Sequence, residues 1–358
     1  MTGPSHKLAF QARRMNAGIT SVQKAKATIT SLAEELGLST CTVSKVLNKS
    51  FDGFSYAPAT VRRVEALAKR RGYIPNMHAR SLRTRKSMNA GLVVPSGIPY
   101  FTGTLVEAIE STLRDDGYET IVGHSTSDSD KEKNLLKNVL GRGVDGLLWI
   151  PFSDKLTPES LGISGEFPLV ILDRPGCSSR FPAVITDNPA ASRELATELV
   201  SLGVREVAML TSDCGDWSIG ERERGVAEVF GRRVKRHVSP NDIKAAKRLA
   251  IQILPGLGGR SLLCLTQSLA MGALQAMREL DLRPGVDIGF ACFDSLPLCE
   301  IWHPSLCRVE QDIEALAREG VRLLLDKIRD PKTPQPLETR IAGRFVRGDS
   351  ALPSRSNR

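Results

Sequence analysis

The side chains of this chain that are best suited to chemistry are basic, and they are gathered at one end. Residues 1–87 contain 16 Lys and Arg against 4 Asp and Glu, a net charge of +12, whereas residues 88–358 contain 33 against 36, a net charge of −3. Guanidinium and ammonium groups bind phosphate, while evenly spread charge would only aid solvation. The segregation therefore predicts a polyanionic partner, such as nucleic acid, for the first quarter of the chain alone.

Catalytic and metal-binding chemistry has little support in the sequence. Phosphate-binding, dinucleotide-binding, nucleophile-elbow and zinc-protease signatures are absent, and the Gly-rich stretch at 256–261 precedes a predicted strand instead of opening a helix. The 5 histidines lack metal-ligand spacing, and the 7 cysteines are scattered without a CxxC pair. The sequence thus predicts reduced core thiols, no metal, no cofactor and no enzyme activity, with an α/β enzyme as the main alternative.

Membrane and secretion signals are missing as well. The sequence has no run of about eighteen uncharged apolar residues, which a membrane-spanning helix would need. Its first residues are basic, without an apolar stretch before a small-residue cleavage site. We therefore expect a cytoplasmic protein.

Three short helices are predicted to position the basic side chains. The first covers residues 28–36 and ends at Gly37, Ser39 caps the second, and the third ends at Gly72. Apolar residues recur at helical spacing in each: Ile29, Leu32, Ala33 and Leu36; Val43, Val46 and Leu47; Val61, Val64, Leu67 and Ala68. This pattern predicts a small all-α helix-turn-helix domain over residues 28–75, after a disordered basic arm at 1–27. A three-helix bundle that does not bind DNA is the alternative.

The rest of the chain alternates between strands and helices. Apolar runs such as GLVVP, DGLLWIP, PLVILD, EVAMLT and SLLCLT separate helical stretches at 102–116, 131–141, 189–202, 219–230, 242–254, 268–280 and 311–330. Such alternation is typical of parallel α/β sheets, and two sheets accommodate this many strands better than one. The sequence predicts a two-lobed α/β core over residues 88–348 and a tail at 349–358.

Two segments, TITSLAEELGLSTCTVSKVLN and PATVRRVEALAKRRGYIPNMHARSLRTRKSMNAGLVVP, resemble the opening of the lactose/galactose-repressor family of bacterial transcriptional regulators. The resemblance continues through VDGLLWIP, VILDRP, SIGERERG and LAMGALQAMRELDLRPGVDIGFACFD, and fructose-type repressors are the most similar branch. It implies a sequence-specific regulator of the repressor type, with a helix-turn-helix domain, a hinge, and a core of two parallel-sheet lobes like a periplasmic binding protein.

The resemblance implies that the second helix lies in the major groove of DNA. Thr40, Cys41 and Lys45 would face base edges, where Lys45 can donate to O6 and N7 of guanine. The family usually has an arginine at this position, and lysine lacks its bidentate geometry. Other residues would contact the DNA backbone or flank the helix: Thr28, Ser39, Thr42, Ser44, Asn48, Thr60 and Tyr73. Helix capping is the alternative role for Ser39 and Thr42.

Residues 76–87 resemble the family's hinge helix. Asn76 can cap this helix, and Ala79 and Leu82 lie three residues apart on one face. In the family, the leucine wedges between base pairs in the minor groove, which implies the same role for Leu82. A helix this short, surrounded by arginines, is expected to fold only on DNA. The alternative is an exposed leucine in a basic linker.

The core resemblance implies two lobes joined by three crossovers, near Asp187, near Glu310 and near Glu338, with an effector in the cleft between them. Carboxyl ends of parallel strands face such a cleft. The candidate effector-binding residues are Ser96, Tyr100, Phe101, Asp173, Arg174, Arg222, Gln267 and Asp294. Arg222 occupies the arginine of the family pattern S-x-x-x-R-x-x-G; a solvated helical arginine is the alternative.

Ligand and assembly follow from these residues. Two arginines at one cleft would suit an anion. The family's usual Asn-Asp is replaced by Thr266-Gln267, and its usual Gly-Phe-Asp-Asp by Cys-Phe-Asp-Ser at 292–295. We therefore expect a sugar or, preferentially, a sugar phosphate; a degenerate pocket is the alternative. One helix-turn-helix unit reads half a palindrome, which predicts a homodimer on a palindromic double-stranded operator. A non-regulatory DNA-binding protein would leave the core without a purpose.

Overall fold

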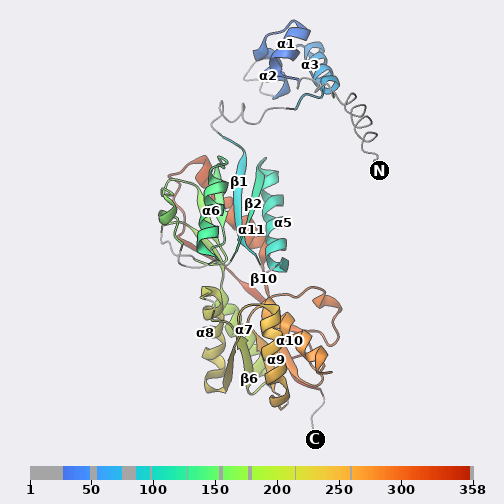
Figure 1. The fold of residues 1–358 in the computed structure, drawn as a ribbon, viewed down its shortest axis with the longest axis vertical. Helices are drawn as coiled ribbons and strands as arrows, with labels where there is room; N and C mark the ends of the chain where they lie inside the picture. The colour runs from blue at the N-terminus through green and yellow to red at the C-terminus, as the bar shows by residue number, and fades with distance from the viewer. Residues whose placement is uncertain are drawn as a thin grey trace, which may run out of the picture. The chain divides into compact units, whose positions relative to one another are not determined.

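The computed structural model describes residues 27–48, 55–74, 86–96, 99–126, 128–152, 156–175, 180–213, 215–258 and 260–354. The chain forms two compact units, residues 1–80 and residues 81–358, drawn in Figure 1. The first is helical, and the second contains two six-stranded sheets with helices on both faces. The predicted fold class is confirmed. Within the described ranges, no helix has the length and apolar character that crossing a membrane requires.

The helical unit contains α1 (Ile29–Leu36), α2 (Thr40–Leu47) and α3 (Pro58–Arg71). The Thr28 side chain accepts a hydrogen bond from the amide of Ser31, and the Ser39 side chain accepts one from Thr42, so each cap fixes the start of its helix. Gly37, with a φ of 64°, ends α1 in the left-handed region. Seven of the described residues form the buried core of this unit, all of them predicted: Leu32, Ala33, Val43, Val46, Val64, Leu67 and Ala68.

The N-terminal lobe of the larger unit is built on an entirely parallel sheet with strand order β11-β5-β4-β3-β1-β2. Its strands are β1 (Asn89–Pro95), β2 (Glu119–Ser125), β3 (Gly146–Trp149), β4 (Leu169–Leu172), β5 (Ala183–Thr186) and β11 (Glu338–Ile341). Helices α5 (Pro99–Asp115) and α11 (Ile313–Arg329) pack on one face, and α6 (Ser129–Leu140) packs on the other. A short 3₁₀ turn covers Glu159–Leu161.

The C-terminal lobe repeats this plan, with strand order β12-β10-β9-β8-β6-β7 and an antiparallel β12 at one edge. Its strands are β6 (Val207–Thr211), β7 (Val234–Val238), β8 (Ser261–Cys264), β9 (Gly289–Phe293), β10 (Cys307–Gln311) and β12 (Gly343–Val346). Helices α9 (Ile243–Ile253) and α10 (Gln267–Glu279) cover one face, and α7 (Asn188–Ser201) and α8 (Trp217–Phe230) cover the other. Short 3₁₀ turns cover Gly231–Arg233, Leu254–Gly256 and Cys299–Ile301.

Side-chain caps explain where the helices of the core begin. Six of them start directly after a residue whose side chain accepts a backbone N–H of the first turn: Asp128, Asp187, Asp216, Asp242, Thr266 and Asp312. Such caps satisfy amides that have no partner within the helix. Several of these residues lie at the carboxyl ends of strands, so the caps gather polar side chains at the edge where the two sheets face each other.

Close packing explains one glycine of the sequence pattern. A Cβ atom on Gly225 would lie 2.5 Å from the carbonyl oxygen of Pro189 and 2.8 Å from Cβ of Ser192. Glycine at this position therefore lets α8 lie directly against α7. The contact fixes the orientation of α8, which carries Arg222 one turn and Ser218 two turns before Gly225.

Three crossovers connect the lobes within the described residues. The first lies at Asp187, between β5 and α7, and the second lies at Asp312, between β10 and α11. The third lies at Ala342 instead of near Glu338, because residues 338–341 still pair with β5 as strand β11. The prediction placed this crossover too early.

Two further features depart from the sequence predictions. Strand β7 was not predicted, because its sequence VKRHV is polar and it lies at an exposed sheet edge. The predicted tail is partly ordered in the lobe: Ser350 is fully buried, its hydroxyl donates to the carbonyl of Phe290 at 2.6 Å, and it accepts from the Cys307 amide at 2.9 Å. The predicted tail is therefore wrong for residues 349–354, and residues 355–358 lie outside the described residues.

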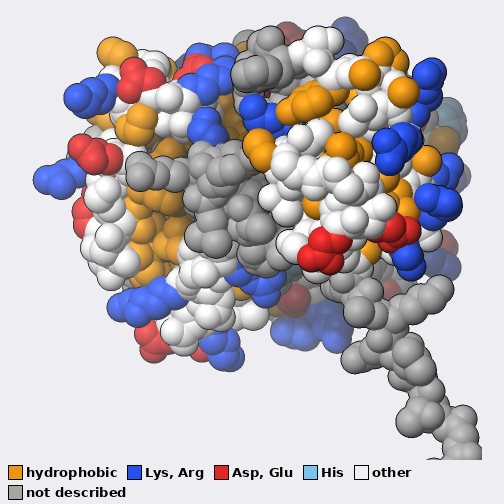
Figure 2. All heavy atoms as spheres, turned by 90° about the horizontal axis from the view of Figure 1, so that it is seen from above, with side chains coloured by type: hydrophobic (Ala, Val, Ile, Leu, Met, Phe, Trp, Pro, Cys, Tyr) orange, Lys and Arg blue, Asp and Glu red, His pale blue; other side chains and the backbone are white. Residues whose placement is uncertain are grey.

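Charges of opposite sign are interspersed on the molecular surface seen from above (Figure 2). In the core, Arg193 pairs with Glu228 at 2.6 Å and Arg322 with Glu319 at 2.7 Å. Exposed pairs like these stabilise a fold only slightly. They do show that basic residues of the core are locally compensated, as its net charge of −3 suggests.

Candidate functional site

Three side chains of α2 that the sequence predicted to face DNA share one face of the helix. At 3.6 residues per turn, Thr40, Cys41 and Lys45 lie opposite the buried Val43 and Val46. Thr40 and Cys41 are exposed in the first turn, and Lys45 is half-buried. This face points away from the buried core of the helical unit, in agreement with the sequence prediction about its orientation.

The smaller polar residues of α2 hydrogen-bond locally. The hydroxyls of Ser39 and Thr42 lie 2.9 Å apart, and the Ser39 hydroxyl also accepts the Thr42 amide at 3.0 Å. The Asn48 side chain donates to the carbonyl of Ser44 at 2.7 Å. Capping is therefore an observed role for Ser39 and Asn48, while DNA contact by any of these residues stays a prediction.

The other predicted DNA contacts divide into two groups. Thr28 is exposed at the N-cap of α1, Thr60 is half-buried in the first turn of α3, and Tyr73 is half-buried just after α3. Burial raises the pKa of the Tyr73 hydroxyl, which keeps it protonated and able to donate. Asn76, Ala79 and Leu82 lie outside the described residues, so the hinge helix stays a prediction.

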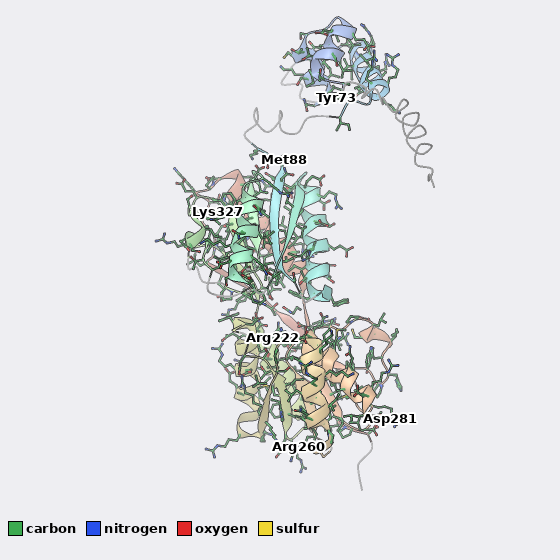
Figure 3. All side chains as sticks on the ribbon, in the orientation of Figure 1. Tyr73, Met88, Arg222, Arg260, Asp281 and Lys327 are labelled. Atoms are coloured by element: carbon green, nitrogen blue, oxygen red, sulfur yellow. The ribbon has the colours of Figure 1, made fainter. Side chains whose placement is uncertain are left out.

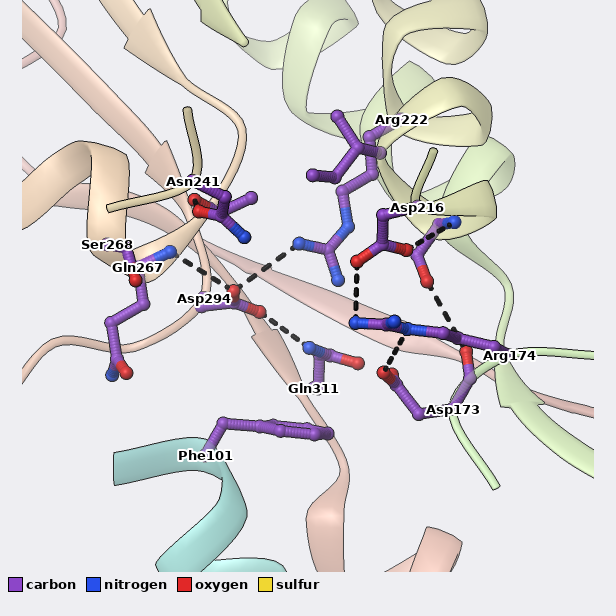
Figure 4. Close-up of a pocket in the computed structure, with 13 residues that line it drawn as sticks. Phe101, Asp173, Arg174, Asp216, Arg222, Asn241, Gln267, Ser268, Asp294 and Gln311 are labelled. Atoms are coloured by element: carbon purple, nitrogen blue, oxygen red, sulfur yellow. Dashed lines mark hydrogen bonds and ion pairs between the residues drawn. The ribbon is translucent and has the colours of Figure 1, made fainter. Parts of the chain in front are cut away.

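A polar cleft lies between the two lobes of the core (Figure 4). Strand ends and helix starts of both lobes supply its walls. It is lined by Phe101, Asp173, Arg174, Asp216, Ser218, Ile219, Arg222, Asn241, Thr266, Gln267, Ser268, Asp294 and Gln311. Only about 30 Å³ of it is open to water-sized molecules in this closed arrangement, room for about two waters.

Arg222 is held rigidly on the C-terminal side of the cleft. Its Nε donates to Oδ1 of Asn188 at 2.8 Å, and its Nη1 donates to the carbonyl of Leu265 at 2.9 Å and approaches Oδ2 of Asp294 at 3.4 Å. The guanidinium also lies 3.8 Å from the ring centroid of Phe293, a cation–π distance. All of these partners belong to the same lobe, so the predicted inward orientation of Arg222 is confirmed and the solvated alternative is wrong.

Arg174 instead joins the two lobes. Its Nη1 donates to the carbonyls of Pro151 at 3.0 Å and Phe152 at 2.7 Å, both in the N-terminal lobe. Its Nη2 lies 2.7 Å from Oδ2 of Asp216, the residue that caps α8 in the C-terminal lobe. The guanidinium therefore forms a buried ion pair across the cleft.

Two aspartates occupy corresponding positions in the lobes. Asp173 directly follows β4 and Asp294 directly follows β9, and both have left-handed backbones, with φ of 64° and 78°. Such a conformation costs energy for a non-glycine residue and is concentrated at functional sites. The turn directs both carboxylates into the cleft, where Asp294 also accepts from the side chain of Gln311 at 2.5 Å and the amide of Gln267 at 3.3 Å.

The Asp173 carboxyl is the least satisfied group of the cleft. Its Oδ1 is buried and has no hydrogen-bond partner among the described residues, and its Oδ2 lies 3.8 Å from Nε of Arg174. Burial raises the pKa of Asp173 to about 6; the neighbouring Asp216 and Asp294 act in the same direction, and Arg174 and Arg222 oppose it. The carboxyl can therefore accept or donate a hydrogen bond near neutral pH.

Six of the eight predicted effector-binding residues line this cleft: Phe101, Asp173, Arg174, Arg222, Gln267 and Asp294. Ser96 and Tyr100 are exposed and are not among its lining residues. In α5 the helical phase turns Phe101 inward and its neighbour Tyr100 outward, and the Ser96 hydroxyl donates to the carbonyl of Ser125 instead. Their placement in the cleft was wrong.

The predicted set lacked six polar lining residues: Asp216, Ser218, Asn241, Thr266, Ser268 and Gln311. Asp216 carried the signal of a helix cap, since it precedes α8 directly. Gln311 ends a strand at a predicted crossover, and its side chain reaches Asp294. Asn241 follows β7, a strand that was itself not predicted, so no sequence signal pointed to this residue.

Comparisons with known proteins cover nearly the whole chain. Residues 196–351 match the family described as periplasmic binding protein-like domain. Catabolite control protein A of Staphylococcus epidermidis is 24% identical over 317 residues, which cover 86% of this chain and 94% of that protein. The probable HTH-type transcriptional regulator EndR of Paenibacillus polymyxa is 26% identical over 313 residues, which cover 84% and 90%.

Solved structures share the fold. A Lac repressor dimer bound to operator and the anti-inducer ONPF superposes with a TM-score of 0.78 at 24% identity, covering 91% of this chain and 99% of that one. A complex of the transcriptional regulator CelR with cellobiose gives a TM-score of 0.64 at 21% identity, covering 91% and 100%. The resemblance therefore spans both the helical unit and the two-lobed core.

Proposed function

We propose that this chain is a member of the lactose/galactose-repressor family of DNA-binding transcriptional regulators, and a repressor whose affinity for DNA is set by an uncharged sugar bound between its lobes. It acts in the bacterial cytoplasm as a homodimer on a palindromic operator. Closeness to the fructose-type branch stays a prediction. The observation that carries the proposal is the closed polar cleft, with its buried charges and the unsatisfied oxygen of Asp173.

The charge balance of the cleft favours an uncharged ligand. Among its described lining residues, the cations Arg174 and Arg222 are each paired with a carboxylate, Asp216 and Asp294, and Asp173 adds a third acid. An anionic ligand would have to displace a carboxylate from a guanidinium or remain next to it, at a cost in desolvation and repulsion. The expectation of a sugar phosphate assumed two unpaired arginines, and this pairing argues against it.

The remaining groups suit a sugar. Hydroxyl groups can donate to the carboxylates and accept from guanidinium and amide groups, so one polyol can use both kinds of partner. The open Oδ1 of Asp173 supplies an acceptor, and the buried ring of Phe101 supplies an apolar surface for a sugar ring, opposite Gln311 in Figure 4. Among the relatives, CelR was solved with cellobiose. A sugar is much larger than the open volume, so the lobes must separate to admit it.

Calorimetric titration of the full chain with neutral mono- and disaccharides and with their phosphate esters tests the ligand class. We expect at least one neutral sugar to bind, and its phosphate ester to bind at least about tenfold more weakly, as the loss of one favourable charge contact would give. Asp294→Asn should abolish this binding, whereas Asp116→Asn, on the surface of the other lobe, should not change it. Tighter binding of the phosphate esters would refute the proposed ligand class.

DNA recognition rests on the exposed face of α2. Lys45→Ala is expected to reduce the discrimination between a duplex selected by the protein from a random pool and a scrambled duplex by about 1–3 kcal/mol. Lys69→Ala removes the same charge from α3 and should weaken both complexes alike. An unchanged ratio for Lys45→Ala would show that this lysine does not read bases.

A hydrophobic groove on the C-terminal lobe supports the homodimer. It has a volume of about 490 Å³ and is lined between α10 and the segment after β9 by Met271, Leu274, Leu282, Pro284, Leu296 and Trp302, among others. Beside it, Leu298 is 66% exposed and Ile301 is 76% exposed. Contiguous exposed apolar surface of this kind marks a protein interface. Ile301→Asp should yield monomers in sedimentation, while Leu337→Asp, an exposed leucine of the other lobe, should remain dimeric; a dimeric Ile301→Asp variant would exclude this surface.

A further inference from the structure

The point at which the chain enters the core is held by one carboxylate. Asp145, directly before β3, accepts hydrogen bonds from two consecutive residues. Its Oδ1 accepts the amide of Ser87 at 2.8 Å and the Ser87 hydroxyl at 3.0 Å, and its Oδ2 accepts the amide of Met88 at 2.9 Å. Ser87 is the last residue of the predicted hinge segment, and β1 begins at Asn89. Both oxygens of Asp145 thus fix the junction between hinge and core.

Neighbouring backbone groups complete this junction. The amide of Glu119, at the start of β2, donates to the carbonyl of Met88 at 2.9 Å, and the amide of Asp145 donates to the carbonyl of Asn89 at 2.8 Å. Met88 has a φ of 57°. This left-handed conformation is uncommon for residues other than glycine and persists only where the surroundings impose it. The starts of β1, β2 and β3 therefore meet at Met88 and determine its backbone conformation.

The junction also sets the environment of a neighbouring tyrosine. Tyr118 is buried beside the junction, and burial raises its pKa to about 12, with a further contribution from the Asp145 carboxylate. The tyrosine therefore stays protonated at neutral pH, and it can donate toward Asp145.

A short strand connects the junction to the cleft. Strand β3 begins directly after Asp145 and ends at Trp149, and the carbonyls of Pro151 and Phe152 just beyond it hold Nη1 of Arg174. The buried Glu132 fixes this end, because it accepts from Nε1 of Trp149 at 3.1 Å and from the amide of Phe152 at 3.0 Å. In Figure 3 Met88 lies at the end of the N-terminal lobe that is remote from Arg222 and the cleft.

We propose that Asp145 is a positioning residue that couples the cleft to DNA binding, by fixing where the hinge segment leaves the core. The inference rests on the proposed function. A carboxylate is needed because all of its contacts here are hydrogen-bond donors; the amide of an asparagine would place an N–H group against the Ser87 or the Met88 amide. The Asp145 contacts fix the hinge to the starts of β1 and β3, and the segment after β3 holds Arg174 of the cleft.

The test compares the full-length wild type with Asp145→Asn, Ser87→Ala and Asp116→Asn. The probes are a duplex that the wild type selects from a random pool and a scrambled duplex of equal length, titrated at one salt concentration. For Asp145→Asn we expect the ratio of the two affinities to fall by about tenfold, at the upper end of what residues in coupling networks produce, with scrambled-duplex affinity unchanged. Ser87→Ala, which loses one of the three contacts, should show a smaller fall, and Asp116→Asn none.

Hydrogen exchange supplies a second readout. The amides of residues 87–89 should exchange faster in Asp145→Asn, while those of β4 and β9 remain as protected as in the wild type. A wild-type affinity ratio retained by both Asp145→Asn and Ser87→Ala would overturn the inference, and so would unchanged exchange at the junction. A wild type that selects no sequence would instead contradict the proposed function on which the inference rests.

Discussion

The two arginines of the cleft are both buried and both paired with aspartate, yet they differ in what holds them. Arg222 finds Asn188, Leu265, Asp294 and the ring of Phe293 within its own lobe. Arg174 divides its guanidinium between carbonyls of the N-terminal lobe and Asp216 of the C-terminal lobe. The contacts of Arg222 do not depend on how the lobes are placed, whereas the contacts of Arg174 form only when the lobes are closed.

This difference separates recognition from closure. A preorganised guanidinium loses little freedom when a ligand binds, so Arg222 and Asp294 form a fixed recognition surface. The Arg174–Asp216 pair stabilises only the closed arrangement of the lobes, and it must break or move when a sugar enters. A ligand shifts the balance between lobe arrangements only through contacts that differ between them, and Arg174 and Asp216 supply such contacts.

Arg222→Ala should have the largest effect. It leaves Asp294 buried without its cation, which costs about 3–5 kcal/mol of unfolding free energy, and it removes the fixed side of the sugar site. Denaturant unfolding measures the loss of stability, and calorimetry with the neutral sugar identified by the titration proposed above measures the loss of binding. Arg224→Ala on the same helix removes an exposed arginine paired with Glu221 and should change stability by no more than about 0.5 kcal/mol. Wild-type stability in Arg222→Ala would exclude the network described here.

Breaking the pair across the lobes should have an intermediate effect. Arg174→Ala and Asp216→Asn should each lower the unfolding free energy by about 1.5–3 kcal/mol, the range for a hydrogen bond to a charged group. This loss is smaller than that for Arg222→Ala because separation of the lobes returns the unpaired group to water, and asparagine can still cap α8. Because each variant removes the same contact, their effects should not add in the double variant. Small-angle scattering should also show a larger radius of gyration. Additive losses, with no change in radius, would mean that the pair does not hold the lobes together.

The smallest effect concerns pH. The pKa of Asp173 is about 6 in the folded protein and about 3.9 in the unfolded chain. Between these pH values the folded state therefore binds more protons than the unfolded state. Its contribution to stability is therefore fully present below pH of about 4 and is lost as pH rises through about 6. Asp173→Asn should flatten this part of the curve of melting temperature against pH. Burial raises the pKa of Glu132 in the same direction, so some slope should remain. A slope as steep as that of the wild type would contradict the assignment.

The sequence predicted what local spacing determines. Ser218, Arg222 and Gly225 are four and three residues apart, which places them on one face of α8, and the structure confirms that this face is buried against the cleft and α7. The core helices were predicted within a few residues because caps and apolar periodicity define them. The residues of the helical core were predicted for the same reason.

Contacts between distant segments could not be predicted in this way. The pairing of Arg174 with Asp216 depends on the closed placement of two lobes, and no spacing along the chain encodes it. Without that pairing, the two arginines suggested an anionic ligand. Tyr100 and Phe101 differ only in helical phase at the start of α5, where a shift of one residue exchanges an exposed side chain for a buried one.

The central claim is that a sugar in the cleft and DNA on the helical unit affect each other's binding. Calorimetric titration of the full chain with the neutral sugar, without and with a saturating amount of the selected duplex, tests this directly. Because coupling between two sites is reciprocal, the account predicts that the duplex changes the affinity for the sugar by about fivefold or more, in either direction. An affinity for the sugar that is the same with and without the duplex would contradict it.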